Sequence, residues 1–186
     1  MSLSNLLGTE WTPQPLLVYK PRKSGDGVAM RVQLRLEPEW EQGDGFARPV
    51  IKGNGGLFLE LAEQQGTGEG GFAKFGWSDP NIVRVKLGLP DVSKILASLE
   101  QVRLAGQELP ASFRGKDQDP FTLSLFHKFG DQSTAITLKL EADRSFLRVS
   151  KAKDWNRAIS LEVHEELQLR AYLGLALTGF LRVGLR

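Results

Sequence analysis

The sequence contains no cysteine and only two histidines. The absence of cysteine excludes disulfide bonds, thiolate nucleophiles and cysteine-ligated zinc, and it fits a reducing compartment. His127 and His164 lie in separate predicted elements without an acid or nucleophile spaced around them, and no H-x-x-x-H or D-x-D-x-D-G pattern of metal ligands occurs. We therefore expect a protein that is not an enzyme and that uses no metal or other cofactor.

Long apolar runs are also missing. The most apolar stretch, residues 167–183, is interrupted by Arg170 and Arg182. It is shorter than the roughly 20 apolar residues that a membrane span needs. Residues 1–8 lack the basic region of a targeting signal. The sequence thus predicts a soluble cytoplasmic protein without a membrane partner.

Neither sign of charge dominates, since the formal net charge is +2. This value permits a nucleic-acid partner without requiring one, because the placement of charges matters more than their sum. The 186 residues, of which 41% are hydrophobic, are enough for one domain, or for two halves that share one core.

Two glycine-rich stretches lack the features of a phosphate-binding loop. Residues 52–56 precede a predicted strand, so no helix dipole is available there to hold a phosphate. Residues 66–71 contain no Lys-Ser or Lys-Thr pair. Both stretches are predicted to be loop tips, and residues 52–56 are also a place where the backbone could pass close to a ligand or another chain.

What the sequence does contain is a repeat. Residues 31–104 and 121–186 each hold four short alternating segments followed by a helix, which predicts an α+β fold of duplicated ββββα units. We expect an N-terminal arm or leading strand in residues 1–30 and a single pseudo-symmetric domain in 31–186, with halves 31–108 and 119–186. The two strand-to-helix junctions align in register: Pro90, Asp91, Ile95, Ala97 and Leu99 match His164, Glu165, Leu169, Ala171 and Leu173.

The two predicted helices differ. The first has one apolar stripe, whereas the second is apolar around most of its circumference, which is typical of a helix buried on more than one face. That second helix is either a site of self-association or the central core helix of a monomer, and the pattern leaves both open. The expected oligomer-interface residues are Leu169, Tyr172, Leu175 and Phe180.

Basic and aromatic residues alternate on the predicted strands. Arg84 and Lys86 share the outward side of their strand, close in sequence to Phe75 and Trp77, and the second half has a similar group. Cationic grooves with aromatic platforms bind single-stranded nucleic acid, because every base has a π-face that can stack. A solvated sheet face with its aromatics turned inward is the more common alternative.

The duplicated plan resembles the Whirly family of plant single-stranded-DNA-binding proteins and their structural relatives, which include kinetoplastid guide-RNA-binding proteins and a smaller transcriptional coactivator. Residues 52–57, Lys-Gly-Asn-Gly-Gly-Leu, are similar to the family's Lys-Gly-Lys-Ala-Ala-Leu motif. Trp77 and the run through 83–96 are similar to the family's Asp-Trp, strand and Ser-Pro-x-Glu-Val segment entering the first helix. The last strands and the closing helix occupy the expected places. Asn54 stands where the family has its second lysine.

The resemblance covers roughly residues 30–184 as a pattern. It implies two antiparallel four-stranded sheets packed roughly perpendicular, with the helices joining subunits into a dimer or tetramer. It also implies non-catalytic, largely sequence-independent binding of single-stranded DNA or RNA. Bases would stack on Phe75, Trp77 and Phe126 or Trp155, and phosphates would meet Lys52, Lys74, Arg84, Lys86, Lys128, Lys151, Lys153 and Arg157.

Two other functions compete with nucleic-acid binding. The first is an oligomeric protein-interaction or structural module of the same fold that binds no nucleic acid. The second is a small-molecule-binding β-sandwich or barrel, which is less favoured because a helix splits the two groups of strands.

Overall fold

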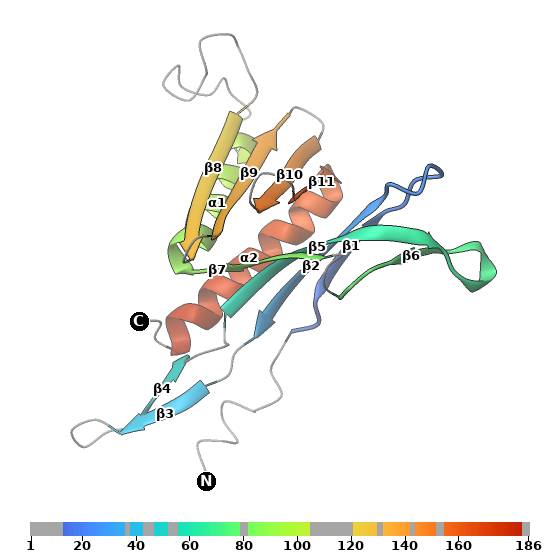
Figure 1. Cartoon of the computed structure of the whole chain (residues 1–186). Coiled ribbons are helices and arrows are strands. Elements are labelled where there is room, and N and C mark those ends of the chain that lie inside the picture. Colours follow the sequence, from blue (N-terminus) through green and yellow to red (C-terminus); the bar gives the residue numbers. More distant parts are fainter. Residues whose placement is uncertain are drawn as a thin grey trace.

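Two antiparallel sheets, a separate hairpin and two long helices make up the described part of the chain (Figure 1). The structure is a computed structural model, and it describes residues 13–35, 38–42, 47–51, 56–78, 82–104, 121–129, 132–141, 144–151 and 155–183.

The first sheet is built around one long central strand, β5, which pairs with β2 along one edge and with both β6 and β7 along the other. β1 pairs with the far edge of β2. The strands of this sheet are β1 (Leu16–Lys20), β2 (Val28–Arg35), β5 (Gly56–Thr67), β6 (Ala73–Phe75) and β7 (Ile82–Leu87).

The second sheet is a simple meander in which each strand pairs with the next along the chain. Its strands run in a clearly different direction from those of the first sheet (Figure 1). They are β8 (Phe121–Phe129), β9 (Gln132–Leu140), β10 (Arg144–Lys151) and β11 (Trp155–Glu162).

Each sheet is followed directly by a helix, α1 (Leu89–Leu104) or α2 (Val163–Val183). At both junctions the residue before the helix donates its backbone N–H to an acidic side chain three positions later. The Gly88 N–H bonds Asp91 Oδ2 at 3.0 Å, and the Glu162 N–H bonds Glu165 Oε2 at 2.8 Å. Such a bond satisfies a donor at the helix start and places a negative charge near the positive end of the helix dipole.

The repeat and the α+β class are therefore confirmed, with one correction. Strand positions β1, β2, β5 and β6/β7 correspond to β8, β9, β10 and β11. The first sheet has five strands, not four, because its fourth position is divided into β6 and β7. Its first strand, β1, is the leading strand that was one of the two expectations for residues 1–30. The sequence pattern also missed the hairpin of β3 (Pro38–Gln42) and β4 (Ala47–Ile51), which is inserted between β2 and β5.

One continuous apolar core joins both sheets and both helices. α1 lies against β8 and β9, and α2 lies against β10 and β11 and packs on α1 (Figure 1). Strand alternation turns one side of each sheet toward this core. The core rows include Val32, Leu59 and Val85 across the first sheet and Leu138, Leu147 and Ile159 across the second.

The helix α2 belongs to this core. Leu169, Tyr172 and Phe180 are buried within the chain, so these three residues cannot contact a second copy unless the core opens. Leu175 is partly buried. The sequence left open whether α2 is a core helix or a site of self-association, and the burial of these residues places α2 in the core.

Tyr172 also connects α2 to the first sheet. Its hydroxyl oxygen accepts a 3.0 Å hydrogen bond from the Leu34 N–H, which lies beyond the last β1–β2 pair, Leu16 with Val32. The hydroxyl therefore satisfies a buried backbone donor of β2 that lies past the N-terminal end of β1 and has no partner on that strand. Burial raises the pKa of Tyr172 above its ordinary value of 10.0, against the opposing effect of the hydrogen bond from Leu34.

Neither α1 nor α2, the two long helices in the described part of the chain, is long and apolar enough to cross a membrane.

We expect Tyr172→Phe to lower the free energy of unfolding by about 1–2 kcal/mol near pH 7, because the buried Leu34 N–H loses its acceptor. The raised pKa adds a pH dependence. The hydroxyl's contribution is fully present below pH 10 and is lost as the pH rises through the folded-state pKa. Urea unfolding of both proteins between pH 7 and 11 should show their difference shrinking above pH 10. A constant difference would contradict this account.

Candidate nucleic-acid interface

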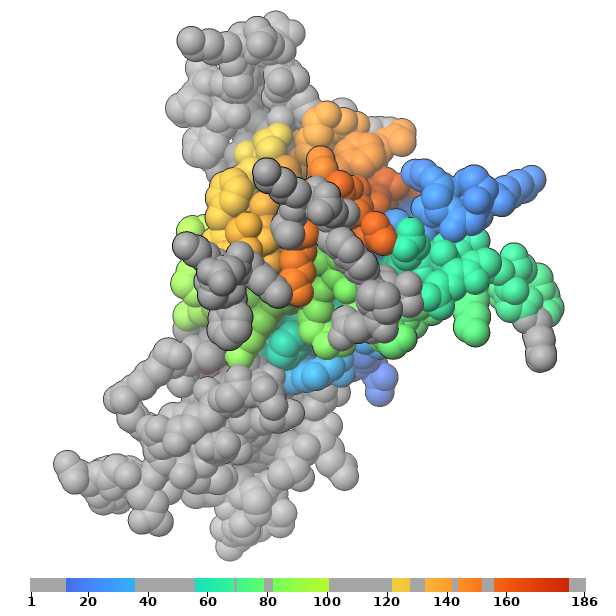
Figure 2. Space-filling model, viewed as in Figure 1, coloured from blue at the N-terminus to red at the C-terminus, as the bar shows by residue number. Residues whose placement is uncertain are grey.

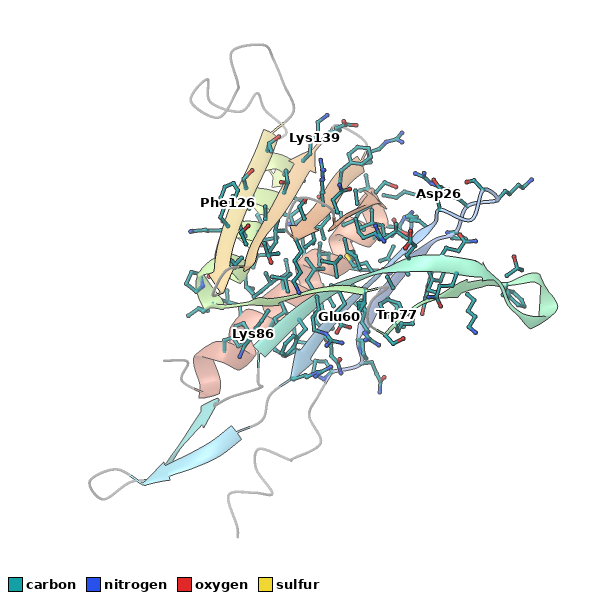
Figure 3. The ribbon with its side chains drawn as sticks, viewed as in Figure 1. Asp26, Glu60, Trp77, Lys86, Phe126 and Lys139 are labelled. Atoms are coloured by element: carbon teal, nitrogen blue, oxygen red, sulfur yellow. The ribbon has the colours of Figure 1, made fainter. Side chains whose placement is uncertain are left out.

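The outer face of the first sheet, meaning the side turned away from the core, carries most of its charged residues. On β2, β5 and β7 the core residues alternate with Arg31, Glu60 and Arg84, which stand directly opposite one another in the strand register. The next outer row contains Phe58 and Lys86. Figure 3 shows Glu60, Lys86 and Trp77 along this same side of the sheet.

Glu60 lies at the centre of this face and is completely buried, with 0% exposure. Its two carboxylate oxygens accept hydrogen bonds from the Nε–H groups of Arg31 and Arg84. The arginine side chains are themselves 24% and 44% exposed. A buried carboxylate is tolerated when it is paired and hydrogen-bonded, so the two arginines stabilise Glu60 while still reaching solvent.

Aromatic rings lie beside the arginines. The Arg31 Cζ is 4.6 Å from the centre of the Trp77 ring, and the Arg35 Cζ is 4.9 Å from the centre of the Phe58 ring. Both distances are within the range of cation–π attraction. The outer face thus holds two arginine–aromatic pairs; Arg31, Arg35 and Phe58 lie on strands of the first sheet, and Trp77 lies between β6 and β7.

A third aromatic group lies toward β1 and β6. The ring centres of Tyr19 and Phe75 are 5.5 Å apart, and Tyr19 is 48% exposed. At the other end of the sheet, Gly56 makes room for Lys86, since a Cβ on residue 56 would lie 2.6 Å from Lys86 Cε. A side chain at that position would displace the lysine from the outer face.

The structure brings together four of the expected binding residues, Phe75, Trp77, Arg84 and Lys86. Lys74 is exposed on β6, and Lys52 lies outside the described residues. Sequence reasoning missed other members of the face, although the alternation of residues 31–35 contained the signal: if Val32 and Leu34 point to the core, their neighbours point away. The missed residues are Tyr19, Arg31, Arg35, Phe58 and Glu60.

The expected residues of the second half whose side chains the structure describes, Phe126, Lys151 and Arg157, do not join this face. Phe126 is 80% exposed, but it lies on β8 of the second sheet, away from Glu60 and Trp77 (Figure 3). Lys151 follows Val149 on the core side of β10 and is partly buried. The side chains of Lys128 and Trp155, and the whole of Lys153, lie outside the description.

Arg157 has a structural contact instead. It lies on the core side of β11, and its Nη2 donates to Glu63 Oε2 at 2.7 Å. A second link is close by, where Lys20 Nζ lies 2.7 Å from Glu165 Oε2 and 3.2 Å from Glu162 Oε1. Burial lowers the pKa of Lys20, but its two glutamate partners outweigh this and leave it raised. Both links connect the first sheet to β11 and the start of α2.

A groove of about 320 Å³ runs between the β1–β2 turn and β11. Figure 2 shows the β1–β2 turn projecting to one side of the second sheet. The charged side chains that line the groove are already paired, Lys20 with Glu165 and Arg22 with Asp26 at 3.0 Å. Within the described ranges, no group of three or more acidic or histidine side chains is placed to hold a metal ion.

Because Arg157 joins the two halves, we expect Arg157→Gln to change stability and not ligand binding. The free energy of unfolding should fall by about 1 kcal/mol, since the ion pair is only partly exposed. A double-mutant cycle with Glu63→Gln should show that the two effects are coupled. If Arg157→Gln binds an oligonucleotide more weakly while its stability is unchanged, Arg157 contacts the ligand and this prediction is wrong.

Comparisons with known proteins give no family assignment. No protein-family model matches the chain, and no curated protein matches it.

Proposed function

We propose that the protein is a non-catalytic single-stranded nucleic-acid-binding protein of the cytoplasm that binds DNA or RNA along the outer face of its first sheet. The observation that carries this proposal is the joint placement of cations and rings on that face. Arg31 lies over Trp77, Arg35 lies over Phe58, and Arg84 reaches solvent beside them.

The chemistry of this face suits an extended strand. Guanidinium and ammonium groups attract phosphates, whereas aromatic rings and guanidinium planes provide surfaces on which unpaired bases stack. Stacking and charge do not distinguish one base from another. The proposed binding is therefore largely independent of sequence and strongly dependent on salt.

The proposed site is confined to the first sheet. Phe126 is an exposed aromatic residue, but it is separated from the arginine–aromatic pairs (Figure 3). Its isolation makes it a suitable control for aromatic stacking on a different surface of the same protein.

Self-association into a homo-oligomer is a separate proposal. Since Leu169, Tyr172 and Phe180 lie in the core, an interface on α2 would use exposed apolar residues such as Val163 and Leu167, which are 56% and 60% exposed. Light scattering of the intact protein beside Leu167→Glu tests this surface. A monomer in the unmodified protein would contradict an assembly of the Whirly type.

We expect a fluorescently labelled oligothymidine to bind the intact protein at low salt. The affinity should fall as salt rises, with a log–log slope of about −0.7 for each phosphate contacted. Trp77→Ala should weaken binding roughly tenfold, because a stacked base contributes about 1–3 kcal/mol. Phe126→Ala is the matched control and should bind as the intact protein does.

Two results would contradict the proposal in different ways. Absence of binding at low salt would leave the protein-interaction module as the favoured function. Binding that is unaffected by Trp77→Ala but weakened by Phe126→Ala would move the site to the second sheet.

A further inference from the structure

Arg31, Glu60 and Arg84 form a row across three strands in which one carboxylate bonds two arginines. The three residues are aligned across β2, β5 and β7, so the acid stands between the two bases. Each carboxylate oxygen engages one arginine, and it does so through Nε in both cases. The carboxylate therefore fixes the inner edge of both guanidinium groups.

Among the residues that the structure describes, the outer donors of these arginines have no hydrogen-bond acceptor. A guanidinium group has five N–H donors, of which Glu60 uses one from each arginine. In the part of the chain that the structure describes, no hydrogen bond engages the Nη atoms of Arg31 or Arg84. Two guanidinium groups held at one edge, with free donors at the other, suit an oxyanion with several acceptor oxygens.

The net charge of the row suits an anion with a single negative charge. Two arginines and one carboxylate leave the row with a single net positive charge, because guanidinium groups stay protonated in proteins. A phosphodiester carries one negative charge and would neutralise the row. Trp77, beside Arg31, adds a stacking surface next to this position.

We propose that Arg31 and Arg84 form a subsite for one backbone phosphodiester of the bound strand, with Glu60 as the positioning residue that orients both arginines. This inference rests on the proposed function. Free arginine side chains lose rotamer entropy when they bind a ligand. The Glu60 carboxylate removes part of that loss in advance, since it already holds each side chain by its Nε.

The variant Glu60→Gln distinguishes the positioning of the two arginines from an effect of the total charge of the face. The variant removes a negative charge from the face, so a face that acts only through its charge would bind oligothymidine more tightly. The proposal predicts the opposite sign. The amide replaces one carboxylate oxygen by an NH2 group that cannot accept, so the arginine bonded at that oxygen loses its position and the affinity falls roughly tenfold. Equal or tighter binding by a folded Glu60→Gln protein would overturn the proposal.

Arg84→Lys tests the subsite without altering the charge of the chain, and it serves even if Glu60→Gln fails to fold. Lysine cannot use an Nε–H to bond Glu60 and still present a planar fork to phosphate. The proposal predicts that Arg84→Lys loses nearly as much affinity as Arg84→Gln. The matched control is Arg148→Lys, which changes an exposed arginine on β10 of the second sheet and should have no effect.

A phosphate contact also has its own signature. Arg84→Gln should weaken oligothymidine and oligodeoxycytidine by the same factor and reduce the salt slope by about 0.7, since one phosphate contact is lost. A loss confined to one base would indicate a base contact and would overturn the subsite. If Trp77→Ala weakens binding while Arg84→Lys does not, this inference fails alone. If the intact protein binds neither oligonucleotide at low salt, the proposed function fails as well.

Discussion

The register of β5 is the constraint on which the rest of the structure depends. One side of this strand supplies Leu57, Leu59 and Leu61 to the core, and the other side supplies Phe58 and Glu60 to the outer face. A slip of one residue would exchange the two sets, placing a carboxylate in the core and leucines in solvent. The apolar core and the charged outer face are therefore specified by the same pairing.

Local signals made much of the fold predictable from the sequence. Alternation identified the core sides of the strands, and Asp91 and Glu165 marked the two helix starts at equivalent positions. The site was harder to predict from the sequence, because the two arginines that bond Glu60 are 29 and 24 residues away from it along the chain. β1 is the leading strand that was one of two expectations for residues 1–30. The β3–β4 hairpin was missed, since short strands among prolines and glycines give weak periodicity.

The separation of Arg157 from the outer face was not foreseen, for a different reason. Grouping basic residues by proximity in sequence ignored strand parity, although Arg157 and Ile159 are two residues apart and must share a side. Parity would have turned Arg157 toward the core, where Glu63 meets it. The environment of α2 could not be predicted for another reason. A helix that is apolar on several sides can be covered by other elements of its own chain or by a second copy, and its composition does not show which of them covers it.

The divided fourth strand of the first sheet has a consequence for the surface of the molecule. In the second sheet the equivalent strand, β11, is continuous, whereas in the first this position is interrupted between β6, which ends at Phe75, and β7, which begins at Ile82. Trp77 lies within this interruption and comes to rest over Arg31. The two halves thus differ in their surfaces: in the part of the chain that the structure describes, only the first has a ring beside the row of Arg31, Glu60 and Arg84. The core residues of β5, β7 and β11 are buried all the same, so the irregular edge changes the outer face without opening the shared core.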